Sequence, residues 1–163
     1  MHCTTAPNPR ISETHVGAYP HVPCNMSSIG DELGRRLAGS GCKRLALWAM
    51  GVVEHIAMEF PDSDAVAEST VLCSEAVDGF IDGTMDHQEV RRRAVSVKRS
   101  SIHADGMESV ALMTIHHAIS TCIDAGQGIR VSECASKVMA ELYPDADTDD
   151  ELEWQLSYLS RLS

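Results

Sequence analysis

The sequence predicts an all-α protein, a single-domain bundle of about six to seven helices around a central apolar helix spanning residues 107–124. Three observations support this class. Aromatic residues make up only 4% of the chain, so side chains that favour strands are scarce. No stretch alternates apolar and polar residues with the period of a strand. No proline falls between Pro61 and Pro144, which leaves a long span free to form helices.

The first 27 residues are predicted to be irregular or extended, and residues 28–163 to form one helical domain. Proline lacks an amide donor and restricts the residue before it. Four of the six prolines lie in residues 1–27: Pro7, Pro9, Pro20 and Pro23. The helical domain opens with a short helix over residues 28–38, which places Ile29, Leu33 and Leu37 on one side.

Two longer helices are predicted next. The first spans residues 42–60 and carries apolar residues at the spacing of a buried stripe. These residues are Leu45, Trp48, Ala49, Val52 and Ile56. Residues 61–64 end this helix and cap the next, over residues 64–81. Its predicted buried side holds Val66, Cys73, Val77 and Phe80.

A capping box predicts the start of the fourth helix, over residues 87–102. Asp86 is its N-cap and Glu89 the third helical residue, while Met85 and Val90 can form a hydrophobic staple. The helix carries five basic residues: Arg91, Arg92, Arg93, Lys98 and Arg99. We expect a solvated face, which could also pair with the acidic segment 145–153 or with an acidic partner.

The central helix is apolar over most of its circumference, which is typical of a helix buried on several sides. Asp105 and Glu108 predict a capping box at its start, and Gly126 and Gly128 predict a left-handed turn at its end. It is too short and too well capped for a membrane span. We expect His116 to be the more buried of its two histidines, and His117 to reach solvent or a partner.

The last part of the chain is predicted to form two helices separated by an acidic loop. The first, over residues 129–143, has its apolar face at Val131, Cys134, Ala135, Val138 and Leu142. Six of the nine residues 145–153 are acidic. Thr148 and Glu151 then predict a capping box for a closing helix. This helix carries Leu152, Leu156 and Leu159 on one side, with Trp154 and Tyr158 on another.

Composition restricts the compartment and the partners. The formal net charge of −11 opposes binding to nucleic acid or to an anionic membrane, so neither is predicted as a partner. The six cysteines form no CxxC pair, and the N-terminus has no apolar core or cleavage pattern of a secretory signal. We therefore expect a cytoplasmic protein.

No catalytic residue, metal or cofactor is predicted, although an enzyme is left open as the less favoured class. The chain has no GxSxG, P-loop or GxGxxG motif. His116 and His117 point about 100° apart on a helix, so a shared metal would need further ligands such as Glu54 and His55. In the N-terminal segment, Cys3, His15, His21 and Cys24 match no standard zinc spacing.

Three stretches together resemble the immunity protein family of bacterial polymorphic toxin systems, small all-helical cytoplasmic proteins. The first is residues 45–60, LALWAMGVVEHIAMEF, with its Glu-His pair and the acidic turn that follows. The second is residues 85–102 with the helix after them, where His117 and Thr121 match a His and a Thr of the family. The third is residues 151–162, ELEWQLSYLSRL. The resemblance covers about residues 42–162.

The resemblance implies a protein that neutralises a toxin domain by binding it, and leaves a homo-oligomer open. We expect the binding surface at the polar edge of the closing helix and the acidic loop before it. Trp154 and Tyr158 are its candidate aromatic anchor, because such side chains dominate interface hot spots. The alternative is that both rings dock the closing helix onto the body of the protein. The predicted residues of the surface are Asp147, Asp149, Asp150, Glu153, Trp154 and Tyr158. Further polar or ligand positions are Glu54, His55 and His117. Two alternatives remain: a metal-dependent enzyme or sensor using histidines of the two apolar helices, and an acidic inhibitor that mimics nucleic acid.

Overall fold

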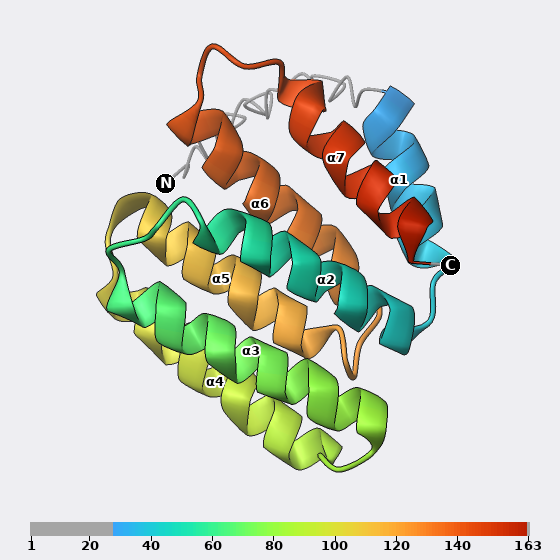
Figure 1. Cartoon of the computed structure of the whole chain (residues 1–163), viewed down its shortest axis with the longest axis vertical. Helices are drawn as coiled ribbons and strands as arrows, with labels where there is room; N and C mark the ends of the chain where they lie inside the picture. The colour runs from blue at the N-terminus through green and yellow to red at the C-terminus, as the bar shows by residue number, and fades with distance from the viewer. Residues whose placement is uncertain (1–27, 163) are drawn as a thin grey trace, which may run out of the picture.

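The computed structural model describes residues 28–162, apart from the side chain of Thr148, and confirms the all-α class for this part of the chain. The prediction for residues 1–27 lies outside the described residues. The described range forms seven helices, whose arrangement is drawn in Figure 1. They are α1 (Ser28–Ala38), α2 (Cys42–Ala57), α3 (Asp64–Asp82), α4 (His87–His103), α5 (Gly106–Ser120), α6 (Gln127–Leu142) and α7 (Thr148–Arg161).

Helix α5 is the centre of the bundle, as predicted. It packs against α2, α3, α4 and α6, and in Figure 1 it runs between and behind α2 and α3. A helix surrounded on this many sides needs apolar or internally bonded side chains around most of its circumference. Its buried residues are Ala111, Leu112, Thr114, Ile115, Ala118 and Ile119. The hydroxyl of Thr114 donates to the Val110 carbonyl, 3.0 Å away, within the same helix.

The predicted capping box of α5 is wrong in its contacts. Asp105 is the N-cap, but its carboxylate accepts no capping hydrogen bond. Glu108 does not reach back to the cap either, because it accepts a hydrogen bond from the Ser63 hydroxyl at the start of α3. The start of the helix therefore depends on Gly106, whose φ of 55° suits glycine.

The predicted end of α5 is also wrong. The helix stops at Ser120, and the chain continues through tight turns, including a bond from the Cys122 amide to the Ile119 carbonyl. Gly126 has a φ of −61° and Gly128 lies inside α6, so neither makes the predicted left-handed turn. Asp124 shapes this connection, because its carboxylate accepts from the Gly126 amide at 3.0 Å.

The predicted core stripe of α2 is confirmed at all five positions, and the caps of α3 and α4 form as expected. The Ser63 hydroxyl accepts from the Val66 amide, and the Asp86 carboxylate accepts from the Glu89 amide at 2.8 Å. The α2 residues are at most 1% exposed: Leu45, Trp48, Ala49, Val52 and Ile56. These caps satisfy amides that the first helical turn leaves without partners.

The basic residues of α4 do not pair with the acidic segment among the residues that the structure describes. Arg93 forms ion pairs with Glu75 of α3 and Glu89 of its own helix, and Arg92 also pairs with Glu89. Glu89 is therefore engaged by neighbouring arginines, and it does not complete the predicted box by bonding the Asp86 amide. The acidic partners of these two arginines therefore come from α3 and from α4 itself.

The thiols are largely part of the packing. Cys73 and Cys122 are almost fully buried, and Cys134 is half-buried. Burial disfavours the thiolate, so it raises the pKa of Cys73 and Cys134 and brings the pKa of Cys122 to about 12. These three cysteines act as small apolar residues, as their helical spacing predicts.

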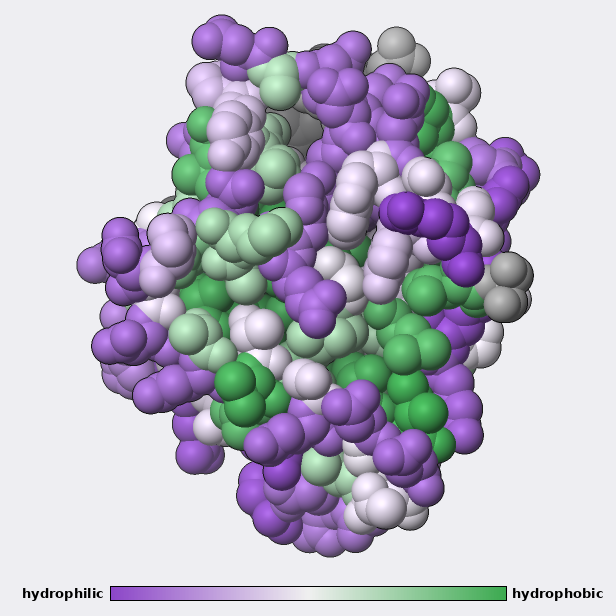
Figure 2. All heavy atoms as spheres, in the orientation of Figure 1, coloured by the Kyte–Doolittle hydropathy of each residue, from purple (hydrophilic) through white to green (hydrophobic). Residues whose placement is uncertain are grey.

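The surface has scattered apolar residues among many polar ones. Figure 2 shows apolar atoms in the middle of one face and hydrophilic atoms along most of its edge. Large exposed hydrophobic residues include Met58, Val71 and Ile102, on or beside three different helices. Dispersed apolar side chains of this kind are normal on a globular protein. Within residues 28–162, no helix is both long and apolar enough to cross a membrane.

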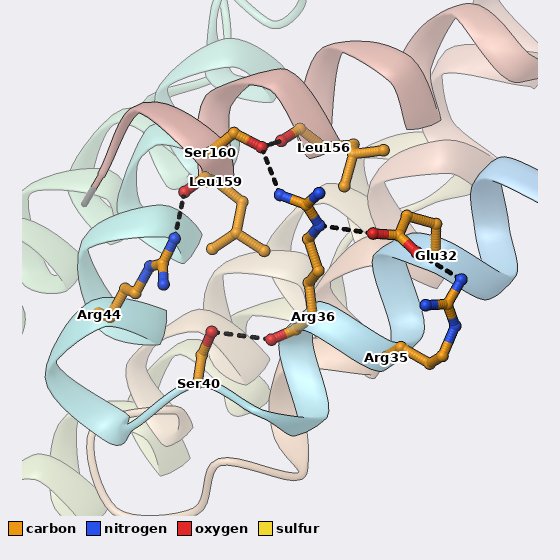
Figure 3. A network of polar contacts seen from close by, with 8 residues as sticks. All are labelled: Glu32, Arg35, Arg36, Ser40, Arg44, Leu156, Leu159 and Ser160. Carbon is orange, nitrogen blue, oxygen red and sulfur yellow. Dashed lines mark hydrogen bonds and ion pairs between the residues drawn. The ribbon is translucent and has the colours of Figure 1, made fainter.

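Helices α1 and α7 form an outer pair, and α7 also packs against α6 and α2 (Figure 1). Polar contacts hold the C-terminal half of α7 in place (Figure 3). The Arg36 guanidinium of α1 donates to the Ser160 hydroxyl at 3.0 Å, and Arg44 of α2 donates to the Leu159 carbonyl at 3.0 Å. Glu32 accepts a hydrogen bond from Arg36 and so keeps the Arg36 side chain directed at α7. The start of α7 is held by different contacts.

Candidate partner-binding site

The acidic start of α7 is organised by Asp147, not by the predicted Thr148–Glu151 box. Asp147 is the N-cap, and its carboxylate accepts from the Asp149 amide at 3.0 Å. Thr148 is the first helical residue. Asp149, Asp150 and Glu151 occupy the first turn, where the helix dipole favours negative charge. Glu151 is thereby free to turn into the protein.

The most buried face of α7 is polar at its beginning. Glu151 is 8% exposed, while Gln155 and Leu159 are fully buried. The predicted apolar stripe is shifted, because Leu152 and Leu156 are only half-buried and Leu159 alone joins the core. Hydropathy gave no signal for this face, since glutamate and glutamine usually lie at the surface.

Glu151 is held between α2 and its own helix. Its Oε2 lies 3.1 Å from Nε2 of His55, and its Oε1 accepts from Nε2 of Gln155 at 2.8 Å. Burial raises the pKa of Glu151, and the bonds from Gln155 and His55 oppose this shift only in part. Trp48 contributes by donating from Nε1 to the Gln155 carbonyl at 3.1 Å. The start of α7 is thus anchored to α2 by polar contacts in a largely apolar setting.

An aromatic stack lies beside this anchor and consists of His55, Trp154 and Tyr158. The centroids of the His55 and Trp154 rings are 4.1 Å apart with planes 19° from parallel. Those of Trp154 and Tyr158 are 5.5 Å apart with planes 5° from parallel. Tyr158 also lies directly against Gly51 of α2 and under the guanidinium of Arg161. The two predicted anchor rings of α7 therefore help to seat α7 on α2.

A pocket of about 300 Å³ opens next to the aromatic stack, between α2, the end of α6 and the start of α7. One wall is apolar and comes mainly from α6, while Asp147 and Asp150 contribute exposed carboxylates. Its lining residues are His55, Ser136, Met139, Ala140, Tyr143, Pro144, Ala146, Asp147, Asp150, Glu151 and Trp154. The contributions of α6 could not be predicted, because nothing in the local sequence pattern indicates that the end of α6 meets α7.

Of the predicted surface residues, Asp147, Asp150 and Trp154 line this pocket, whereas Asp149, Glu153 and Tyr158 do not. Of the predicted ligand positions, only His55 lines it. Asp147, Asp150 and Glu153 are exposed and Asp149 is half-buried, and no ion pair within the described residues engages them. Glu54 is exposed on α2, one residue before His55, and does not line the pocket. These four residues, Asp147, Asp149, Asp150 and Glu153, form an acidic edge that is available for a basic partner.

His116 and His117 belong to a different environment on α5. Nδ1 of His116 donates to the Ala94 carbonyl at 2.8 Å, and Nδ1 of His117 lies 2.9 Å from Oε1 of Gln127. Both side chains are half-buried, so the expected difference in burial between them is not observed. Within residues 28–162, no group of three or more His, Cys, Asp or Glu side chains is placed to hold a metal. The candidate ligands Cys3, His15, His21 and Cys24 lie outside the described residues.

The two α5 histidines predict sensitivity to acid. Burial is the main cause that lowers the pKa of each histidine. Their contribution to folding stability is therefore fully present above about pH 6.5, the pKa of a histidine in the unfolded chain, and is lost as the pH falls through their pKa values in the folded protein. His116→Asn/His117→Asn keeps a side-chain donor near each Nδ1 position. We expect urea unfolding from about pH 7.5 to about pH 5.5 to show a smaller loss of stability in this variant than in the wild type. Equal losses in the two proteins would contradict this prediction.

The protein was also compared with known families and structures. A family model described as "Imm-5 like putative immunity protein" matches residues 40–162, which is most of the chain and includes α2 to α7. Neither the curated proteins nor the solved structures contain a match to this chain.

Proposed function

The chain belongs to the family of Imm-5 like putative immunity proteins, and from this membership we propose that it neutralises a partner toxin by binding it. The proposal places the protein in the cytoplasm of a bacterium, where an incoming or endogenous toxin domain would act. Neutralisation occurs by occlusion or distortion of the toxin and needs no chemical step in this chain. The partner is a protein domain.

The acidic edge beside the pocket at the start of α7 is the observation that supports this place as the toxin-binding surface. Asp147, Asp150 and Glu153 are exposed and have no cationic partner within the described residues. Unpaired charge of one sign steers a partner of opposite sign and increases the association rate. The neighbouring pocket supplies a concave centre of the kind in which interface hot spots are usually found.

The direct test is co-expression with the toxin encoded beside this chain. We expect a stable complex on size-exclusion chromatography and rescue of growth when both proteins are produced. Absence of a complex and of rescue with every genetically linked toxin would contradict the proposed function.

Charge reversal tests the proposed surface. Asp150→Lys/Glu153→Lys is expected to weaken toxin binding by at least about tenfold, mainly through slower association, with a reduced dependence on salt. The matched control is Glu68→Lys/Asp82→Lys, which reverses two exposed acidic residues of α3. Equal effects of the two variants would show that net charge, and not this surface, determines binding.

A further inference from the structure

We propose that the pocket at the start of α7 receives an arginine side chain of the toxin. This inference rests on the proposed function and specifies the chemistry of its interface. The pocket has a volume of about 300 Å³, which is large enough for one long side chain. Three features of its lining select the occupant: an apolar wall, acidic groups and an exposed tyrosine ring.

The apolar wall suits the aliphatic stem of a long side chain. Met139 and Ala140 come from α6, while Pro144 and Ala146 come from the connection to α7. Contacts with these residues would remove the methylene groups of an arginine stem from water, as happens for long cationic side chains on apolar surfaces. A short acidic or hydroxylated side chain would leave this wall unfilled.

The charge of the lining favours a cation. Asp147, Asp150 and Glu151 contribute carboxylates, and none of the lining residues is a lysine or arginine. His55 is directed at Glu151, so it does not offset the carboxylates of Asp147 and Asp150. An entering cation would gain two exposed carboxylates that have no ion-pair partner among the described residues.

Two further groups favour arginine over lysine. Tyr143 lines the pocket with a ring that has no ring partner in the described part of the chain, although its hydroxyl donates to Glu59, which lies just after α2. A planar guanidinium can lie on such a ring and still donate to carboxylates at its edge. The Ser136 hydroxyl oxygen is buried and lacks a hydrogen-bond partner within the described residues, so it offers an additional acceptor.

The test uses Nα-acetyl-arginine methylamide as the probe and ¹⁵N-labelled full-length protein. The chain has two tryptophans, and only Trp154 lines the pocket, whereas Trp48 is fully buried and bonded to Gln155. We expect the indole signal of Trp154 to shift more than that of Trp48, with a dissociation constant on the order of millimolar. The corresponding citrulline derivative, which lacks the charge, should bind at least about tenfold more weakly. The lysine derivative should also bind more weakly than arginine.

Two variants with the same change in net charge separate the pocket from the general acidic field. Asp147→Asn/Asp150→Asn removes both pocket carboxylates, and asparagine preserves the N-cap of α7. Asp145→Asn/Glu153→Gln removes two exposed acidic groups that do not line the pocket. We expect the first variant to weaken arginine binding by about tenfold and the second by less than about twofold.

The inference is overturned if citrulline binds as tightly as arginine, if the two variants weaken binding equally, or if neither indole signal moves. The same two variants are then tested against the toxin. Loss of affinity confined to Asp147→Asn/Asp150→Asn supports the inference. An unchanged affinity in both variants overturns it while leaving the proposed function intact. Absence of any complex with the wild-type protein contradicts the proposed function itself and does not depend on the arginine titration.

Discussion

Replacing Gly51 by alanine is expected to destabilise the folded protein by about 1–3 kcal/mol. A Cβ atom at this position would lie 2.1 Å from Cε1 of Tyr158, so the ring and the atom cannot both keep their places. Two neighbours confine the ring. The centroid of the Trp154 ring lies 5.5 Å from the Tyr158 ring centroid, and Cζ of Arg161 lies 5.6 Å from it. Displacement of the Tyr158 ring would break the aromatic stack. This cost exceeds the gain of up to about 1 kcal/mol that alanine brings to a helix interior.

A double-mutant cycle with Tyr158→Ala isolates this contact. Without the ring, Gly51→Ala should become neutral or stabilising, so the sign of its effect reverses and the coupling reaches about 2 kcal/mol. Gly34→Ala is the matched control, because Gly34 is also inside a helix and a Cβ there meets no atom within 4 Å. It should be neutral or slightly stabilising. Urea unfolding at neutral pH measures the four proteins of the cycle and the Gly34→Ala control. A Gly51→Ala effect that is the same with and without Tyr158 would refute the proposed clash.

The fold could be predicted because its strongest determinants are local and periodic. The α2 stripe containing Trp48 and Val52 is fully buried, and the apolar circumference of the helix around Ile115 corresponds to four packed neighbours. Helix ends were predicted less well. In the predicted box, the Asp105 carboxylate makes no capping hydrogen bond, and Glu108 instead accepts from the hydroxyl of Ser63, the N-cap of α3. A local cap pattern cannot anticipate a competing tertiary partner.

The candidate site could be predicted only in part for a related reason. Asp150 and Trp154, which the sequence patterns assign to one candidate surface, both line the pocket. The pocket, however, also requires Ser136 of α6 and Tyr143 just after it, and the anchor requires Glu151 to turn inward. Burial of a glutamate contradicts its usual preference and depends on a donor from another helix. Such pairings follow from the tertiary arrangement, so one sequence without its structure does not reveal them.

The pairing of His55 with Glu151 gives the second large expected effect, which depends on pH. Because an ionised carboxylate only accepts hydrogen bonds, Nε2 of His55 is the donor in this contact. His55→Phe retains a ring that can stack on Trp154 but removes this donor. At neutral pH we expect a loss of about 1–3 kcal/mol in unfolding free energy, since one oxygen of a nearly buried carboxylate is left without its partner.

The pH dependence separates this hydrogen bond from the stacking. Burial already raises the pKa of Glu151 above 4.5, and loss of His55 removes one of the causes that lower it. A carboxyl group whose pKa is raised on folding contributes to the stability of the folded protein. This contribution is fully present below the pKa of the unfolded state and is lost as the pH rises through the pKa of the folded state. The cost of His55→Phe should therefore be small near about pH 4.5 and grow towards about pH 7.5.

His55→Gln provides the matched comparison, because its Nε2 can still donate to Glu151 while the ring is lost. Its cost relative to the wild type should be about 0.5–1.5 kcal/mol, the usual value of an aromatic pair, and should vary less with pH. Urea unfolding across this range, with carboxyl ¹³C titration of Glu151, measures both quantities. Parallel pH profiles for the two variants would mean that stacking on Trp154, and not the bond to Glu151, fixes the start of α7. Distinct profiles would identify the buried carboxylate as the group that positions the acidic edge proposed to meet the toxin.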